Sequence, residues 1–164
     1  MKGQDIVVLA KLCDPEARAM GYAELGVSLA LSASEVHAAV RRLCECGLLS
    51  RNRIPLRHNM MEFLFSGLRY VFPFRTLGSV VRGIPTAWAA PVASGVFAAD
   101  GPVPVWESPD GDVIGQSYPP LYPTVSQAVL HDRLLYDRLA LFDLARGGRI
   151  RERIWARARL EEMP

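Results

Sequence analysis

The distribution of proline divides this 164-residue sequence into three parts. Residues 1–70 contain two prolines, residues 71–123 contain nine, and the only later proline is the last residue. Proline lacks a backbone donor and breaks helix interiors, so long helices are excluded from the middle part and allowed in the other two. We therefore expect an α+β protein with a Pro/Gly-rich strand-and-loop segment at 71–123 and a C-terminal helical pair at 124–164.

The composition excludes several broad classes. Half of the residues are hydrophobic, which is too many for a disordered chain. No apolar run approaches the length of a membrane span, and the start of the sequence has no secretory cleavage pattern. Three cysteines form no paired framework, which is typical of a reducing compartment, so we expect a cytoplasmic protein without membrane partners. The net charge of +2 says little about partners.

The clearest local signal is a capped helix in the first part. Ser32 and Glu35 form a capping-box pattern, in which each side chain satisfies a free backbone amide at the start of the helix. Apolar residues then recur at helical spacing, and Gly47 follows where a left-handed residue ends many helices. The apolar stripe consists of Val36, Val40, Leu43 and Cys44. The sequence therefore predicts an amphipathic helix with its opposite face free.

Other elements follow from periodicity, turn residues and proline positions. The predicted helices are residues 5–12, 22–29, 57–68, 124–146 and 150–162, and a strand is predicted at 68–74. Residues 103–106 and 113–116 are predicted to form a hairpin around the turn at Pro109, Asp110 and Gly111. Thr124 and Gln127 give a second possible capping box.

The order of these elements resembles the winged helix-turn-helix of bacterial regulators of the broad MarR-like and ArsR-like kind. The resemblance covers about the first third of the chain and is carried by Ala23, Leu25, Leu31, Ser32, Ser34, Val36, Val40, Arg42, Leu43, Gly47 and Leu48. The sequence departs from the pattern at Ala30, where the turn usually has glycine, and at Gly26, which lies inside the first helix. The resemblance implies a DNA-binding domain at 1–70.

In such a domain the free face of the second helix enters the major groove and the wing contacts the backbone or the minor groove. Arg41 is the expected base contact, Arg42 the expected phosphate contact, and Arg51 and Arg53 the expected wing contacts. The full predicted DNA-binding set is Ser34, Glu35, His37, Ala38, Arg41, Arg42, Arg51, Asn52 and Arg53. Many winged helices bind proteins instead, and Glu35 and Glu45 reduce the positive charge of this face.

Several other features have a structural and a functional interpretation. All but two of the 19 basic residues are arginines. Arginine is well suited to phosphate binding, but genomic base composition can produce the same preference for arginine over lysine. Arg149, Arg153 and Arg157 share one helix face. They could form a phosphate-binding stripe, but we favour the interpretation that they are exposed to solvent or pair with nearby aspartates. The aromatic residues of the middle segment line an effector pocket or simply anchor loops.

The sequence favours a homodimeric, sequence-specific regulator of transcription that binds double-stranded DNA, with the first helix or the C-terminal helices as the dimer contact. The alternative is a protein-interaction module, such as an antitoxin-like partner of a neighbouring gene product. No catalytic spacing, cofactor fingerprint or metal-ligand series is recognisable, so we expect neither an enzyme nor a cofactor or metal site.

Overall fold

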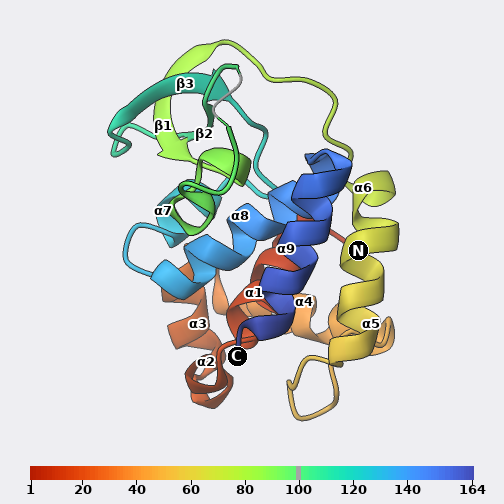
Figure 1. Ribbon diagram of the computed structural model, residues 1–164. Helices are drawn as coiled ribbons and strands as arrows, with labels where there is room; N and C mark the ends of the chain where they lie inside the picture. Colours follow the sequence, from red (N-terminus) through yellow and green to blue (C-terminus); the bar gives the residue numbers. More distant parts are fainter. Residues whose placement is uncertain (99–100) are drawn as a thin grey trace.

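The computed structural model describes residues 1–98 and 101–164 and is a mixed α+β structure. Helices occupy one part of the molecule, and a small three-stranded sheet lies at the opposite end (Figure 1). The helices are α1 (Gly3–Leu12), α2 (Pro15–Ala19), α3 (Tyr22–Leu29), α4 (Ala33–Glu45), α5 (Arg57–Glu62), α6 (Leu68–Val71), α7 (Val125–Ala128), α8 (Arg133–Gly147) and α9 (Ile150–Glu162). The strands are β1 (Val80–Pro85), β2 (Pro104–Glu107) and β3 (Val113–Ser117).

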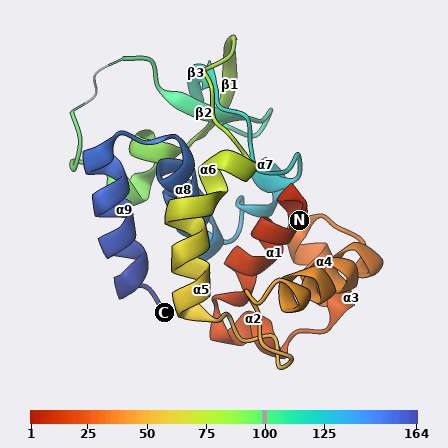
Figure 2. The same ribbon diagram turned by 90° about the vertical axis from the view of Figure 1, so that its right-hand side faces the viewer.

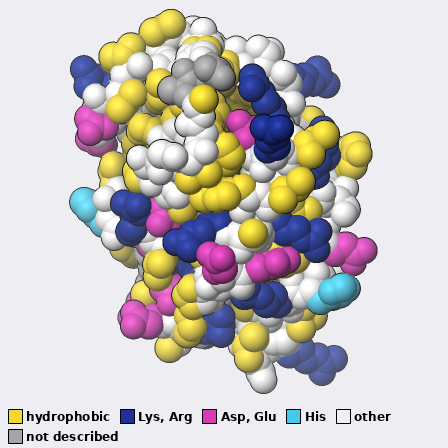
Figure 3. Space-filling view, in the orientation of Figure 1, with side chains coloured by type: hydrophobic (Ala, Val, Ile, Leu, Met, Phe, Trp, Pro, Cys, Tyr) yellow, Lys and Arg dark blue, Asp and Glu magenta, His cyan; other side chains and the backbone are white. Residues whose placement is uncertain are grey.

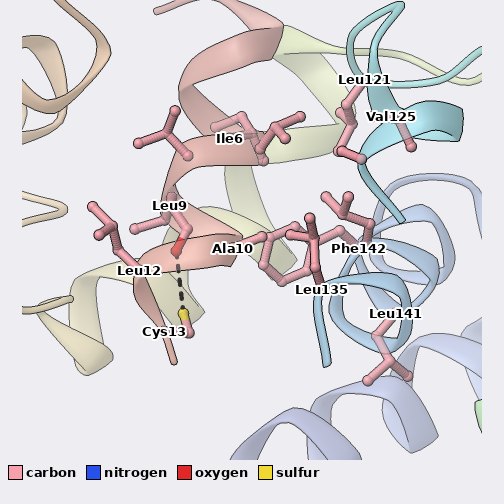
Figure 4. Close-up of a cluster of buried hydrophobic side chains, with 14 of the residues drawn as sticks. Ile6, Leu9, Ala10, Leu12, Cys13, Leu121, Val125, Leu135, Leu141 and Phe142 are labelled. Carbon is pink, nitrogen blue, oxygen red and sulfur yellow. Dashed lines mark hydrogen bonds between the residues drawn. The ribbon is translucent and has the colours of Figure 1, made fainter. Parts of the chain in front are cut away.

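Helix α1 lies at the centre of the helical part. Its residues from Gln4 to Leu12 are all buried, and it packs against both α4 and α8. Ile6, Leu9 and Phe142 meet in the resulting core, which joins the two ends of the chain (Figure 4). A helix with apolar residues around most of its circumference is expected to be surrounded by other elements. Two charged residues of α1 face neighbouring helices: Asp5 pairs with Arg42, and Lys11 pairs with Asp132.

Helices α3 and α4 are joined by a tight turn, and both were predicted from the sequence. Ala30 ends α3 in the left-handed conformation, with φ of 52°. The amide of Leu31 donates to the carbonyl of Gly26. A Cβ atom at Gly26 would lie 2.6 Å from the oxygen of Leu31, so this glycine allows the close approach of the turn. Ser32 caps α4 as predicted, because its hydroxyl accepts from the amide of Glu35.

The region after the α4 loop is helical where a strand was predicted. Helix α5 continues through the π-helical segment Phe63–Gly67 into α6, so the prediction of a strand at 68–74 was wrong. Leu64 and Leu68 are fully buried and lie one helical turn apart, which favours continued helical packing. The chain leaves the helix only at Phe72, before Pro73.

The three strands form a closed barrel, which corrects the predicted hairpin. The strands at Pro104–Glu107 and Val113–Ser117 exist, but both pair antiparallel with β1 and pair parallel with each other. Strand β1 was not predicted, because Gly83 and Pro85 lower the strand propensity of this segment. Two glycines allow close approaches in the barrel: a Cβ atom at Gly83 would meet the backbone of Trp106, and one at Gly111 would meet the backbone of Gly83.

The C-terminal region contains a break that the sequence analysis missed. A single helix at 124–146 was predicted, but α7 ends at Ala128 and α8 begins at Arg133. Asp132 caps α8 by accepting from the amide of Leu135, and it also binds Lys11. The predicted capping box at Thr124 was wrong, since that hydroxyl makes no cap hydrogen bond. The helical pair itself is present as α8 and α9, which pack together.

A buried polar cluster attaches the barrel to α8. The carboxylate of Asp143 accepts from the hydroxyl of Thr86 and from the indole of Trp106, each at 2.8 Å, and from Arg146. The hydroxyl of Tyr118 donates to the backbone carbonyl of Asp143. Burial raises the pKa of Asp143, while Arg146, Thr86 and Trp106 oppose that shift by stabilising the carboxylate. These contacts fix the position of the barrel on the helical part.

Candidate nucleic-acid interface

Helix α4 has one face in the core and one face in solvent. Val36, Ala39, Val40 and Leu43 are buried against α1 and α3. Ser34, His37, Arg41 and Glu45 are exposed along the opposite side. In the turned view, α3 and α4 lie at the edge of the molecule, away from α9 and from the barrel (Figure 2). The exposed side of α4 is therefore not covered by later parts of the described chain.

Arg41 has the freest guanidinium group of the α4 arginines. Its side chain is 67% exposed, and its contact is with Glu45 at 3.6 Å, which is 66% exposed. An exposed pair of this kind within one helix contributes only about 0.3–0.5 kcal/mol. A phosphate or a base edge can replace Glu45 as the partner of Arg41 at little cost.

Arg42 was expected to contact phosphate, but in the structure its guanidinium group binds a carboxylate of the protein. Its guanidinium makes two hydrogen bonds with Asp5, at 2.6 and 2.9 Å, and Asp5 is completely buried. This hydrogen bonding raises the pKa of Arg42. The side chain of Arg42 is only 23% exposed, so it holds α4 against α1 instead of pointing away from the protein.

Arg53 is also engaged inside the molecule. The loop after α4 is closed by a single bridge between Leu49 and Pro55, and Arg53 has φ of 61° within it. The guanidinium of Arg53 donates to the carbonyls of Arg18 and Met20 and lies over the ring of Tyr22. Arg53 therefore fixes the loop against α2 and α3, which differs from the wing contact expected.

Arg51 and Asn52, at the tip of the same loop, are exposed. Neither side chain makes a hydrogen bond or an ion pair with another residue of the described chain. These two residues, with Ser34, His37 and Arg41, form what we call the α4–loop surface. They are the members of the predicted set that the structure leaves available to a partner.

The remaining predicted residues shape the start of α4. Glu35 accepts from the amide and the hydroxyl of Ser32, and these hydrogen bonds lower its pKa. Glu35 is therefore a capping residue, and Ala38 is half-buried beside it. His37 packs edge-on against Tyr22, with 5.1 Å between the ring centres.

Tyr22 was missed by the sequence analysis, although it connects the two parts of the α4–loop surface. Its ring contacts both His37 on α4 and Arg53 in the loop. An aromatic residue at the first position of α3 was the available signal. Tyr22 thus sets the position of the loop relative to α4.

Basic residues near the C-terminus have local partners. Arg157 and Arg159 pair with Glu161 and Glu162 on the same helix, at 3.2 and 3.0 Å. The side chain of Arg153 donates to the carbonyl of Ala145. These residues do not form a continuous free basic stripe, and acidic side chains lie among the basic ones on this face (Figure 3).

Within residues 1–98 and 101–164, no group of three or more His, Cys, Asp or Glu side chains has the arrangement of a metal site. No helix in those ranges is long and apolar enough to cross a membrane. No protein-family model, curated protein or solved structure matches the chain.

Proposed function

We propose that this protein is a sequence-specific DNA-binding regulator of transcription that binds duplex DNA through the α4–loop surface. The observation that carries the proposal is the exposure of Ser34, His37 and Arg41 on one side of a helix whose other side is fixed in the core. A helix held in this way fits the major groove, and arginine is the side chain that most often reads guanine there.

The contacts of Arg42 and Arg53 support the proposal in a second way. By holding α4 on α1 and the loop on α3, they fix the positions of Arg41 and of the loop tip before any DNA binds. A preorganised surface loses less conformational freedom on binding. In this proposal Arg41 contacts a base, whereas Arg51 and Asn52 contact the phosphate backbone.

We further propose that the protein acts as a homodimer through α9. Helix α1 is buried, so it is not available as the dimer contact. In contrast, Ile150 and Ile154 of α9 are 76% and 65% exposed and lie beside Phe65. Two exposed isoleucines one turn apart are costly in water and are stabilised when a second copy covers them.

The DNA proposal is tested by selection of sites from a random duplex library, followed by titration of the enriched site. We expect binding that weakens steeply with salt, because phosphate contacts release counterions. Arg41→Ala is expected to weaken binding by about ten-fold or more and to relax specificity at one position. Arg51→Ala should weaken binding to all sequences alike. The matched control is Arg133→Ala, an exposed arginine on α8 that also has an i,i+4 acidic partner.

Two results would overturn the DNA proposal: a library that yields no enriched sequence, or equal binding by the Arg41→Ala and Arg133→Ala variants. The dimer is tested separately by sedimentation. Ile150→Glu combined with Ile154→Glu should give a monomer with an unchanged fold, whereas Val27→Glu, at an exposed site on α3, should leave the dimer intact. A wild-type chain that sediments as a monomer at high concentration would contradict this part.

A further inference from the structure

A hollow of 390 Å³ lies where the barrel meets the corner between α8 and α9. Its walls come from four segments that are distant in the sequence: the stretch after α6, the stretch after β1, strands β2 and β3 with the residue after β3, and the α8–α9 corner. Small-molecule sites have volumes of about 300–1,000 Å³ and commonly form at such junctions. The hollow is well separated from the α4–loop surface, since the barrel and α4 lie in different parts of the molecule (Figure 2).

One wall of the hollow is aromatic and fixed in position. Tyr118 and Phe74 stack with 4.3 Å between their ring centres and nearly parallel planes. The hydroxyl of Tyr118 is held by the carbonyl of Asp143 at 3.0 Å. Gly147 lies next to these rings, and a Cβ atom there would lie 2.9 Å from Phe74. The lack of a side chain at Gly147 therefore keeps this part of the hollow open.

Trp88 supplies an aromatic wall without an aromatic partner. It is half-buried and lines the hollow. The other two tryptophans each pack against another aromatic ring, Trp106 against Tyr136 and Trp155 against Phe97. No such ring pair includes Trp88 in the described part of the chain. A planar ligand can stack on its face, because offset stacking of aromatic rings is favourable.

The rim of the hollow is basic. Arg75 and Arg149 are exposed there, and neither guanidinium makes a hydrogen bond or ion pair within residues 1–98 and 101–164. Glu152 is the acidic group of the rim, and its carboxylate accepts from the backbone amide of Arg149 at the start of α9. Figure 3 shows basic side chains beside apolar ones near the barrel. Two guanidinium groups that have no partner in those ranges, beside aromatic walls, suit a ligand with an anionic end and an aromatic body.

We propose that this hollow binds a small aromatic carboxylic acid, with its ring against Trp88 and its carboxylate at Arg75 and Arg149. Gln116, which also lines the hollow, offers a further polar contact. The ring lies between the Trp88 wall and the wall of Phe74 and Tyr118, and the carboxylate faces the rim. This binding does not depend on the proposed DNA function, because it uses no residue of the α4–loop surface.

The proposal is tested with 2-naphthoate as the probe and the full chain as the protein, by isothermal titration calorimetry. We expect saturable binding of one molecule per chain. Two matched compounds separate the contributions of charge and ring: the uncharged 2-naphthamide and the aliphatic decanoate should each bind at least ten-fold more weakly. Binding of all three compounds with equal affinity would overturn the proposal, because it would indicate only non-specific apolar adsorption.

Variants locate the binding site. Arg75→Ala combined with Arg149→Ala should weaken naphthoate binding at least ten-fold and leave the thermal midpoint unchanged, since both side chains are exposed. Trp88→Leu should weaken naphthoate binding more than decanoate binding. The control is Arg159→Ala, which removes a basic residue of α9 that is not part of the hollow. The proposal is wrong if naphthoate shows no saturable binding up to about 1 mM, or if the double arginine variant binds it as well as the Arg159→Ala control.

Discussion

The helical region of residues 1–71 and the barrel of residues 80–118 are stabilised in different ways. In the first region, several elements pack on their neighbours in the sequence, as α3 does on α4 and α5 on the π-helical segment. In the barrel, β1 pairs with residues that lie 20 or more positions later, and the sheet is attached to α8 by the carboxylate of Asp143. Local patterns in the sequence reveal the first arrangement but not the second.

The difference extends to the placement of charge. The barrel depends on one completely buried acidic group with three side-chain donors. In the helical region, charged pairs range from the buried contact of Asp5 to the exposed contact of Arg41 with Glu45. The loss in free energy of unfolding when one partner is removed should therefore be largest at Asp143, smaller at Asp5 and smallest for the pair of Arg41 and Glu45. An isolated charge costs most where water is excluded.

The largest effect is expected for Asp143→Ala. The change removes the acceptor of Thr86 and Trp106 and leaves Arg146 buried without its carboxylate. We expect a loss of about 3–5 kcal/mol in the free energy of unfolding, measured with urea. The control is Asp137→Ala on the same helix, whose partner Arg133 is exposed, with an expected loss below about 1 kcal/mol. Equal losses in the two variants would contradict this account of how the barrel is attached.

A smaller loss is expected for Asp5→Ala, about 2–3 kcal/mol. The variant removes both hydrogen bonds of Arg42 and the contact of Asp5 with the amide of Lys2. Arg42 retains partial access to water, which reduces the cost relative to Asp143→Ala. Urea unfolding measures this loss, and Glu45→Ala on the exposed pair is the control. If Asp5→Ala proves as mild as Glu45→Ala, Arg42 is not the link between α4 and α1 that we describe.

The sequence predicted α4 because all the information lies within the helix and its ends. Ser32 and Glu35 mark its start, and the apolar stripe with Gly47 marks its buried face and its end. Strands β2 and β3 were also located correctly. Their pairing was not, because they pair parallel with each other and antiparallel with β1, a strand whose own sequence gives little strand signal.

For the candidate site, the sequence predicted the helix face but not the partners of its arginines. Arg41 and Arg42 are adjacent in the sequence, and nothing near them indicates which one is free. The answer depends on Asp5, which precedes Arg42 by 37 residues. The role of Arg53 likewise depends on the carbonyls of Arg18 and Met20. Sequence periodicity assigns a residue to a helix face, but only the packed structure identifies the partner it has there.

The turn between α3 and α4 offers a test within the helical region. Gly26→Ala would normally stabilise a helix by about 1 kcal/mol. Here the added methyl group meets the oxygen of Leu31, so we expect a net loss of about 1–3 kcal/mol, measured as a lower midpoint in urea. Gly21→Ala, at the N-cap of α3 where a Cβ atom has more room, is the control. A more stable Gly26→Ala variant would show that the turn is looser than described.

At the end of α3, a glycine substitution is expected to increase the free energy of unfolding. Ala30 has φ of 52°, a conformation that costs an alanine about 1 kcal/mol and a glycine almost nothing. Replacing Ala30 by glycine removes this conformational cost, but part of the stabilisation is lost because glycine is more flexible in the unfolded chain. Ala30→Gly should therefore raise the free energy of unfolding by a few tenths of a kcal/mol. A measurable decrease would contradict the left-handed conformation at this residue.

The smallest effect concerns the cap of α4 and depends on pH. The hydrogen bonds from Ser32 lower the pKa of Glu35 below its usual value of 4.5. A lowered carboxyl pKa means that the ionised side chain stabilises the folded state above the unfolded pKa, and that this contribution is lost as the pH falls through the folded pKa. NMR titration of Glu35 should show a lowered pKa in the wild type and a higher pKa in the Ser32→Ala variant, which loses the hydroxyl hydrogen bond but keeps the one from the backbone amide. If the two pKa values agree, the hydroxyl of Ser32 does not stabilise the charged form of Glu35, and the cap is weaker than described.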